Sequence, residues 1–182
     1  MSVTQWDFDL THSSINFHIR HLMVSKVHGR FTKWNGTLEL DEQDLTKSRV
    51  SVEIDPASID TQEPKRDTHL RSADFFEVEK FPAMTFKSTK ITREGDDRFK
   101  VTGDLTIRGV THPVTLDVEG GAQVKDPWGG TRTGFSARTS ISRKEFGLTW
   151  NVALEAGGFM LADKLDITLE IEAVKKAATS AA

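Results

Sequence analysis

Apolar and polar residues alternate along most of this chain, and this period of two constrains the fold more than any other feature. Successive side chains of a strand point to opposite faces, so each alternating stretch predicts a strand with one apolar face. The stretches are residues 6–10, 15–19, 29–40, 50–54, 84–88, 99–107, 114–118, 135–141 and 165–171. Eight or nine such strands favour an antiparallel sheet that closes into a barrel or a sandwich, because open edges invite aggregation.

Three short segments interrupt the alternation. Residues 64–71 begin with a proline at a plausible first helical position, and residues 142–145 have the spacing of a capping box. The third lies around Met23, where an apolar group follows a strand directly. We expect these segments to be short helices or lids at the barrel mouths.

Within the third strand, Phe31 and Trp34 break parity with each other. This spacing predicts a bulge or a sharp bend, as a strongly curved sheet requires.

The composition bounds the class of protein. The 182 residues contain no linker, so we expect one domain over residues 1–174 and a frayed tail over 175–182. A net charge of −3 gives no general attraction to nucleic acid or to anionic membrane surfaces, so any attraction for a phosphate must be local. The absence of cysteine excludes disulfides and thiolate chemistry. Residues 1–14 lack a basic and then apolar signal pattern, which favours a cytoplasmic location.

Catalytic and metal-binding motifs are poorly represented. Four of the six histidines lie between His12 and His28, and His18 and His21 are spaced such that they could approach one metal ion. However, there is no H-E-x-x-H motif, no G-x-S-x-G elbow and no phosphate-binding glycine loop. The sequence therefore favours a binding protein without metal or cofactor over an enzyme.

Residues 12–31 combine an apolar wall with a cationic rim, as a carrier of a long apolar molecule with an anionic head would need. We expect the apolar lumen to be lined by Phe17, Ile19, Met23, Val27, Phe31, Trp34, Val52, Phe86, Leu105, Phe135, Phe146 and Trp150. Candidate contacts to the head group are the cationic or histidine side chains in or beside the three interrupting segments: Arg20, His21, Lys26, Arg66, His69, Arg71 and Arg143.

Several motifs resemble the YceI-like family of bacteria, also called the lipid or polyisoprenoid-binding YceI-like domain. The matching pieces occur in family order over residues 6–174. They include WDFDLTH, FHIRHLMVSKVHGRF, ASIDTQEPKRDTHLRSADFF, FPAMTFKSTKI, GDLTIRGVTHPVTLDV, DPWGG and ISRKEFGLTWN.

The resemblance implies an eight-stranded antiparallel, lipocalin-like barrel that holds a long isoprenoid, such as a polyprenyl phosphate or pyrophosphate or a quinone. The polar head would lie at the mouth. Three alternatives or additions stay open: an enzyme that modifies a lipid or quinone with the clustered histidines, a scaffold barrel that forms a homodimer, and a transient membrane contact.

Overall fold

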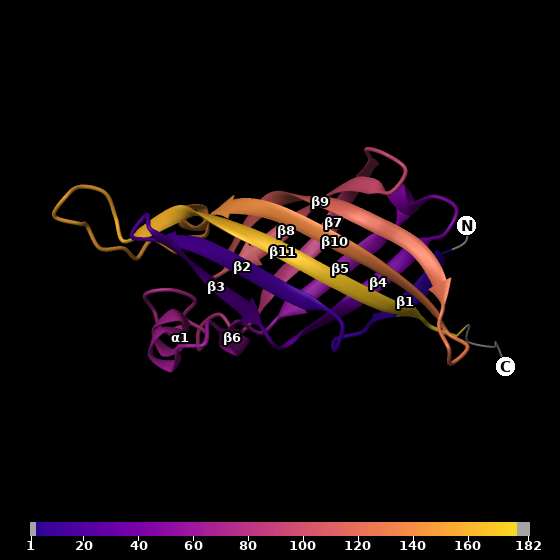
Figure 1. Cartoon of the computed structure of the whole chain (residues 1–182), viewed down its shortest axis with the longest axis horizontal. Coiled ribbons are helices and arrows are strands. Elements are labelled where there is room, and N and C mark those ends of the chain that lie inside the picture. The colour runs from indigo at the N-terminus through magenta and orange to yellow at the C-terminus, as the bar shows by residue number, and fades with distance from the viewer. Residues whose placement is uncertain (1–2, 178–182) are drawn as a thin grey trace.

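A computed structural model describes residues 3–177 as a closed barrel of eight antiparallel strands (Figure 1). In order around the ring they are β1 (Val3–Phe8), β4 (Trp34–Asp41), β5 (Arg49–Ile54), β7 (Met84–Arg93), β8 (Arg98–Ile107), β9 (Val110–Lys125), β10 (Thr131–Ser142) and β11 (Leu161–Lys175). Pairing of β1 with β11 closes the ring. The all-β, lipocalin-like barrel expected from the sequence is confirmed.

Three further strands lengthen one side of the barrel. Residues 161–170 of β11 pair with β2 (Ser14–His21), whereas residues 173–175 pair with β1. Strand β2 then pairs with β3 (Ser25–Phe31), which pairs with the short β6 (Ile59–Asp60). The end of the barrel at this extension is called the mouth below; it consists of the β2–β3 turn (residues 22–24), helix α1 (Pro64–Arg71) and the loop of residues 151–160. The two termini lie at the opposite, far end (Figure 1).

The helical segments are short. Helix α1 (Pro64–Arg71) is preceded by Glu63, whose carboxylate accepts a hydrogen bond from the Arg66 amide. The others are 3₁₀ turns: η1 (Leu45–Lys47), η2 (Pro56–Ser58) and η3 (Arg143–Phe146). No helix among the described residues has both the length and the apolar character needed to cross a bilayer.

Two of the three interrupting segments differ from the expectation, the segment at η3 only in its cap. The predicted capping box at Ser142 is wrong, because the Ser142 hydroxyl instead donates to Asp163 at 2.6 Å. The segment around Met23 is a tight hairpin turn and not a helix, since the Val24 amide donates to the His21 carbonyl.

The stretch expected as one strand over residues 29–40 is two strands, β3 and β4, separated by residues 32–33. This break lets both Phe31 and Trp34 be buried although their spacing is odd, so the predicted bend is confirmed. At the other boundary, β11 continues through Lys175, and the Lys176 amide donates to the Gln5 carbonyl. The part of the predicted tail beyond residue 177 lies outside the described residues.

Candidate ligand-binding cavity

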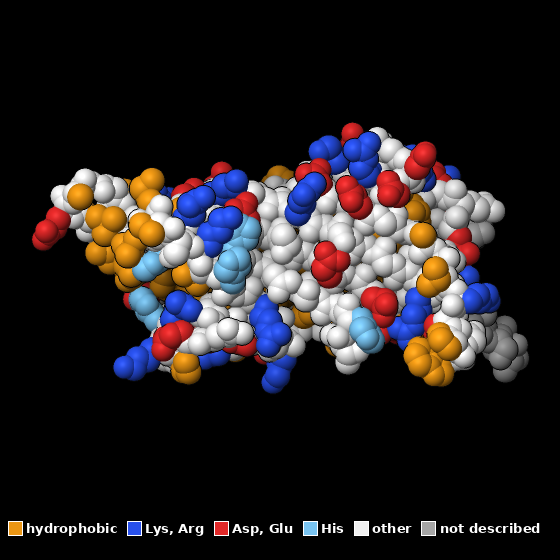
Figure 2. All heavy atoms as spheres, in the orientation of Figure 1, with side chains coloured by type: hydrophobic (Ala, Val, Ile, Leu, Met, Phe, Trp, Pro, Cys, Tyr) orange, Lys and Arg blue, Asp and Glu red, His pale blue; other side chains and the backbone are white. Residues whose placement is uncertain are grey.

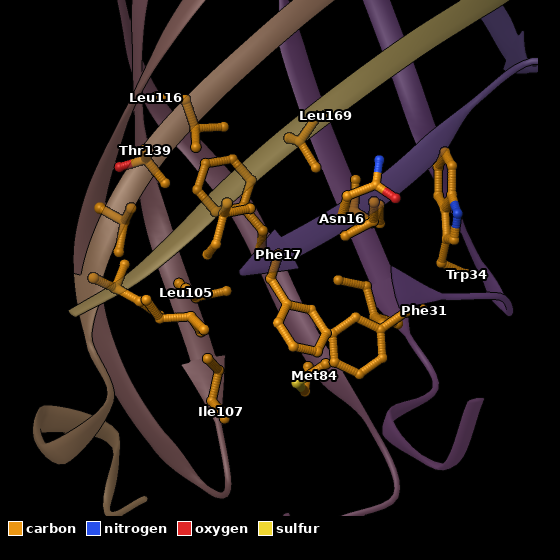
Figure 3. Close-up of a pocket in the computed structure, with 18 of the residues that line it drawn as sticks. Asn16, Phe17, Phe31, Trp34, Met84, Leu105, Ile107, Leu116, Thr139 and Leu169 are labelled. Atoms are coloured by element: carbon orange, nitrogen blue, oxygen red, sulfur yellow. The ribbon is translucent and has the colours of Figure 1, made fainter. Parts of the chain in front are cut away.

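The barrel encloses a cavity of about 610 Å³, within the range typical of small-molecule pockets (Figure 3). Apolar side chains form almost all of its wall. Alternation positions them: on β11, Leu165, Ile167, Leu169 and Ile171 line the cavity. The intervening Thr168 and Glu170 are exposed. The period of two in the sequence therefore separates the wall of the cavity from the outer surface.

Several lining residues are only partly buried although they lie in the middle of strands. Phe17, Leu105 and Leu169 belong to this group, and Figure 3 shows them around the hollow of the barrel. Their side chains pack against the core on one side and border the cavity on the other. The interior is therefore large enough to leave space that these side chains do not fill.

Ten of the twelve residues expected in the lumen line this cavity. They are Phe17, Ile19, Val27, Phe31, Trp34, Val52, Phe86, Leu105, Phe135 and Trp150. Met23 does not, because the turn carries its side chain outward and leaves it 76% exposed. Phe146 does not, because η3 buries it completely, with its ring edge-on to His112.

Sequence reasoning missed part of the wall. Phe75 and Phe76 line the cavity from the irregular segment that follows α1. No alternation marks that segment, so only the adjacent pair of aromatic residues signals it.

Four of the seven residues expected at the head group line the cavity: His21, Arg66, His69 and Arg143. Lys65, which was not predicted, joins them from the first turn of α1. His69 Nε2 lies 2.8 Å from the Asp74 carboxylate, and its ring stands edge-on to Trp150. Polar and cationic groups therefore border the apolar space at the mouth.

Arg143 has an unusual environment. Its side chain is only 3% exposed, and burial lowers the pKa of the guanidinium. Nε donates to the Ala162 carbonyl, and Nη1 donates to those of Leu148 and Trp150. Nη2 is buried without a hydrogen-bond partner among residues 3–177. Since buried donors are normally satisfied, this nitrogen is an unsatisfied donor of a residue that borders the cavity.

Three predicted head-group residues do not line the cavity. Arg20 and Lys26 point to the outer face, because each is next to an inward residue, Ile19 or Val27. Arg71 donates to the carbonyls of Ala57 and Ile59 and so fixes the chain before α1. Its role in the structure is to satisfy backbone groups.

The histidines of β2 and β3 do not form one reactive centre. His18 and His28 lie opposite each other on the outer face, and His18 pairs with Asp166 at 3.1 Å. His21 lies on the inner side, because residues i and i+3 of a strand face opposite ways. The hypothesis of a metal site shared by His18 and His21 is therefore wrong.

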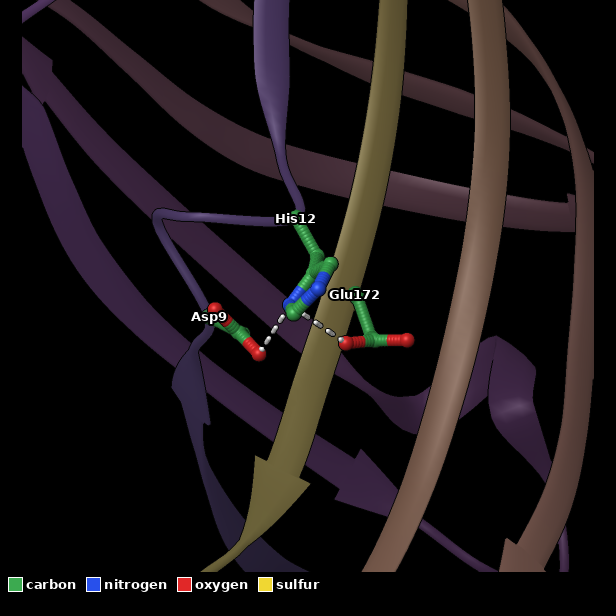
Figure 4. A group of neighbouring side chains, drawn as sticks. All are labelled: Asp9, His12 and Glu172. Carbon is green, nitrogen blue, oxygen red and sulfur yellow. Dashed lines mark hydrogen bonds and ion pairs between the residues drawn. The ribbon is translucent and has the colours of Figure 1, made fainter.

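A charged cluster lies beside the β9–β10 hairpin, which is at the far end of the barrel in Figure 1, and Figure 4 shows three of its members. His12 Nδ1 is 2.9 Å from Asp9 Oδ2 and 3.4 Å from Glu172 Oε2. Arg132 Nη1 donates to the same two carboxylate oxygens, and its Nε donates to Asp126. Asp9, His12 and Glu172 are close enough to ligate a cation. A bound cation would, however, compete with the Arg132 guanidinium for the carboxylate oxygens of Asp9 and Glu172. The cluster joins the turn after β1 to β10 and β11.

The cluster also shifts the ionisation of its members. The hydrogen bond with His12, followed by those with Thr11 and Arg132, lowers the pKa of Asp9. The same hydrogen bond with Asp9 raises the pKa of His12. Both ions are therefore stabilised by the folded arrangement.

A closed eight-stranded barrel around an apolar cavity defines the class of lipocalin-like barrels, which have room for one small ligand. The YceI-like domain model matches residues 6–173, so the chain belongs to the YceI-like family. Protein YceI of Escherichia coli O17:K52:H18 is 41% identical over 165 residues, which cover 91% of this chain and 83% of that protein.

Solved structures share the fold. The YceI protein of Campylobacter jejuni superposes with a TM-score of 0.76 at 32% identity, over 87% of this chain and 91% of that one. A polyisoprenoid binding domain from Saccharophagus degradans has a TM-score of 0.68 at 16% identity, over 94% of this chain and 98% of that one. The second likeness concerns the fold alone.

Proposed function

We propose that this protein binds one long-chain apolar molecule, an isoprenoid or a similar amphiphile, with its tail in the barrel and its polar head at the mouth. The observation that carries the proposal is the apolar cavity of about 610 Å³, bordered at the mouth by His21, Lys65, Arg66, His69 and Arg143. The isoprenoid class is supported by family membership and by the polyisoprenoid-binding protein of the same fold.

The size of the cavity sets an energy scale for binding. If one CH₂ group needs about the ~30 Å³ that a liquid water occupies, the cavity of about 610 Å³ holds about 20 carbon atoms. At ~0.8 kcal/mol per buried CH₂, their burial nominally contributes about 16 kcal/mol. Association and chain ordering offset much of this gain. Apolar burial alone can therefore retain such a ligand, and a longer tail would extend through the mouth.

The head-group side of the proposal rests on Arg143. Its Nη2 lacks a partner among the described residues, while its other nitrogens are held by three backbone carbonyls. A fixed guanidinium suits an acceptor such as a phosphate or quinone oxygen. Polar groups in such a site orient the ligand and need not react with it, which favours carriage or sequestration of the molecule over its conversion.

The test is to fill the cavity from two strands of the wall, β8 and β11. Leu105→Trp on β8 and Leu169→Trp on β11 each place a larger side chain into the lumen. Thr168→Trp is the matched control, because Thr168 precedes Leu169 on β11 and lies on the outer face. We expect detergent-free wild-type protein and the control to release a long-chain amphiphile on organic extraction. Native mass spectrometry should show about one such molecule per chain, and the double variant should carry much less.

An apolar ligand found in equal amount in the wild type and in Leu105→Trp/Leu169→Trp would contradict binding in the lumen. So would a wild-type protein that takes up no long-chain alcohol or isoprenoid when these are supplied in excess.

A further inference from the structure

The mouth exposes apolar side chains on two neighbouring segments. They are Leu22, Met23 and Val24 of the β2–β3 turn, exposed by 41, 76 and 84%, and Val152 and Phe159 of the loop, exposed by 45 and 54%. The Leu22 amide donates to the Met160 carbonyl at 2.7 Å, which holds the two segments side by side. Figure 2 shows apolar side chains gathered at this end of the molecule. Exposed apolar patches of this kind mark interaction sites.

The turn itself is a strained place for such residues. Leu22 and Met23 both have left-handed backbones, with φ of 53° and 57°. When both central residues of a hairpin β-turn have positive φ, as Leu22 and Met23 do, the favoured pair is Asn-Gly, because other side chains meet steric resistance there. Leu22 and Met23 therefore adopt a backbone conformation that is unfavourable for their residue types, and their apolar side chains are also exposed to water. Strain of this kind is characteristic of functional positions.

Two positively charged side chains lie opposite each other on the strands next to the turn. Arg20 and Lys26 lie directly opposite each other on β2 and β3, and both are exposed. Neither forms an ion pair with another residue in the described part of the chain. Like charges in directly opposed positions destabilise a sheet, whereas an anion between them would relieve the repulsion. On the loop side, Lys144 Nζ lies over the Phe159 ring, and Glu155 is the acidic residue of the loop.

We propose that the mouth docks on an anionic lipid bilayer. The apolar turn and Phe159 would enter the boundary between head groups and acyl chains, and Arg20 and Lys26 would meet lipid phosphates. Apolar tips backed by cations are what binding at an anionic interface requires. A second copy of the chain fits less well, because pairing two mouths would bring the Arg20–Lys26 pairs of both copies together.

The proposal goes beyond lipid binding in the cavity and does not depend on it. Docking by this end would place the entrance of the barrel against the membrane, so a lipid tail could pass between bilayer and lumen without crossing water.

The experiment compares binding to phosphatidylcholine vesicles with and without phosphatidylglycerol, measured by co-sedimentation. The wild type should bind the anionic vesicles and bind them less as salt increases. Leu22→Asn/Met23→Gly builds the favoured turn, so it should fold normally and yet bind at least tenfold less. Lys26→Ala should bind about fivefold less.

The matched control removes exposed apolar surface at other positions, with Val124→Thr/Trp128→Gln, and should bind as the wild type does. The Leu105→Trp/Leu169→Trp variant should also bind vesicles normally, which separates this proposal from cavity binding. Equal binding by the wild type and Leu22→Asn/Met23→Gly would overturn it. So would a wild type that binds no anionic vesicles but forms a dimer that the same turn variant dissociates.

Discussion

The two ends of this barrel differ in whether their charged groups are paired within the chain. At the far end, Trp6 is 1% exposed, and its indole donates to Thr4. There Arg132 is surrounded by carboxylates that it pairs with directly. At the mouth, Met23 is exposed, and Arg143 keeps one nitrogen without a partner among the described residues. The charged groups of the far-end cluster find partners within the chain, whereas the mouth leaves a buried donor without a partner among the described residues and a run of exposed apolar side chains on the β2–β3 turn. This difference predicts that substitutions at the two ends affect different properties.

The largest effect on stability is expected at the far end. Trp6→Ala removes a fully buried aromatic side chain that packs with Leu38, Leu40 and Ala173. Such a change should lower the free energy of unfolding by about 3–5 kcal/mol, as measured by urea denaturation. Trp128→Ala, at a side chain that is 82% exposed, should change it by less than about 0.5 kcal/mol. Similar losses for both variants would contradict the assignment of Trp6 to the core.

Arg143 is the position at the mouth where structure and binding coincide. Arg143→Lys keeps the charge, but one ammonium cannot replace a planar fork that reaches three carbonyls. We expect a loss of about 1–3 kcal/mol in unfolding free energy, together with weaker retention of an amphiphile that has an anionic head. Arg138→Lys, on the exposed face of β10, is the control for the substitution itself. If both variants match the wild type in stability, the buried fork is not as described.

The far-end cluster should make stability depend on pH in two directions. The lowered pKa of Asp9 adds stability that is fully present above its ordinary value of about 3.9 and is lost as pH falls. The raised pKa of His12 adds stability that is present below about pH 6.5 and is lost as pH rises through the folded value. Thermal melts should therefore show a contribution that is largest between about pH 4 and 6.5.

Asp9→Asn should flatten both limbs of this profile, whereas His12→Asn should remove the limb at higher pH and only part of the acid limb, because Thr11 and Arg132 still lower the pKa of Asp9. A profile for His12→Asn that parallels that of the wild type at all pH values would show that the pair does not contribute.

The smallest expected effect on stability is at the β2–β3 turn, and it has the opposite sign. Leu22→Asn/Met23→Gly relieves two strained backbones, so the unfolding free energy should rise by about 1 kcal/mol. Calorimetry can detect the change as a higher Tm. A lower Tm would mean that the exposed Leu and Met stabilise the folded chain itself, and the contrast between the two ends would then be lost.

The sequence predicted the parts of the fold that follow from alternation. The alternation over residues 165–171 predicted the strand β11 with one apolar face, and in the structure this face lines the cavity. The bend between Phe31 and Trp34 was also visible as an odd spacing. In contrast, the turn at Leu22 and Met23 was not, because it lacks the asparagine and glycine that normally mark such a turn.

Side-chain roles were harder to predict than strand faces. Arg71 and Arg143 both lie beside irregular segments, yet Arg71 binds only backbone carbonyls whereas Arg143 also borders the cavity. Which carbonyls an arginine meets depends on how the loops fold back, and no local pattern encodes that. The far-end cluster was not predicted for the same reason: it joins Asp9 and Arg132, which are 123 residues apart, so no local pattern links them.

The central claim, that a long apolar ligand lies inside the barrel, can be tested directly with the four tryptophans. Trp34 and Trp150 line the cavity, whereas Trp6 and Trp128 do not. Four variants that each keep one tryptophan, with phenylalanine at the other three positions, would be titrated with a brominated long-chain prenol. Binding in the lumen predicts strong quenching of Trp34 and Trp150 fluorescence and little quenching of Trp6 and Trp128. Quenching of Trp128 alone, or of none of the four, would contradict it.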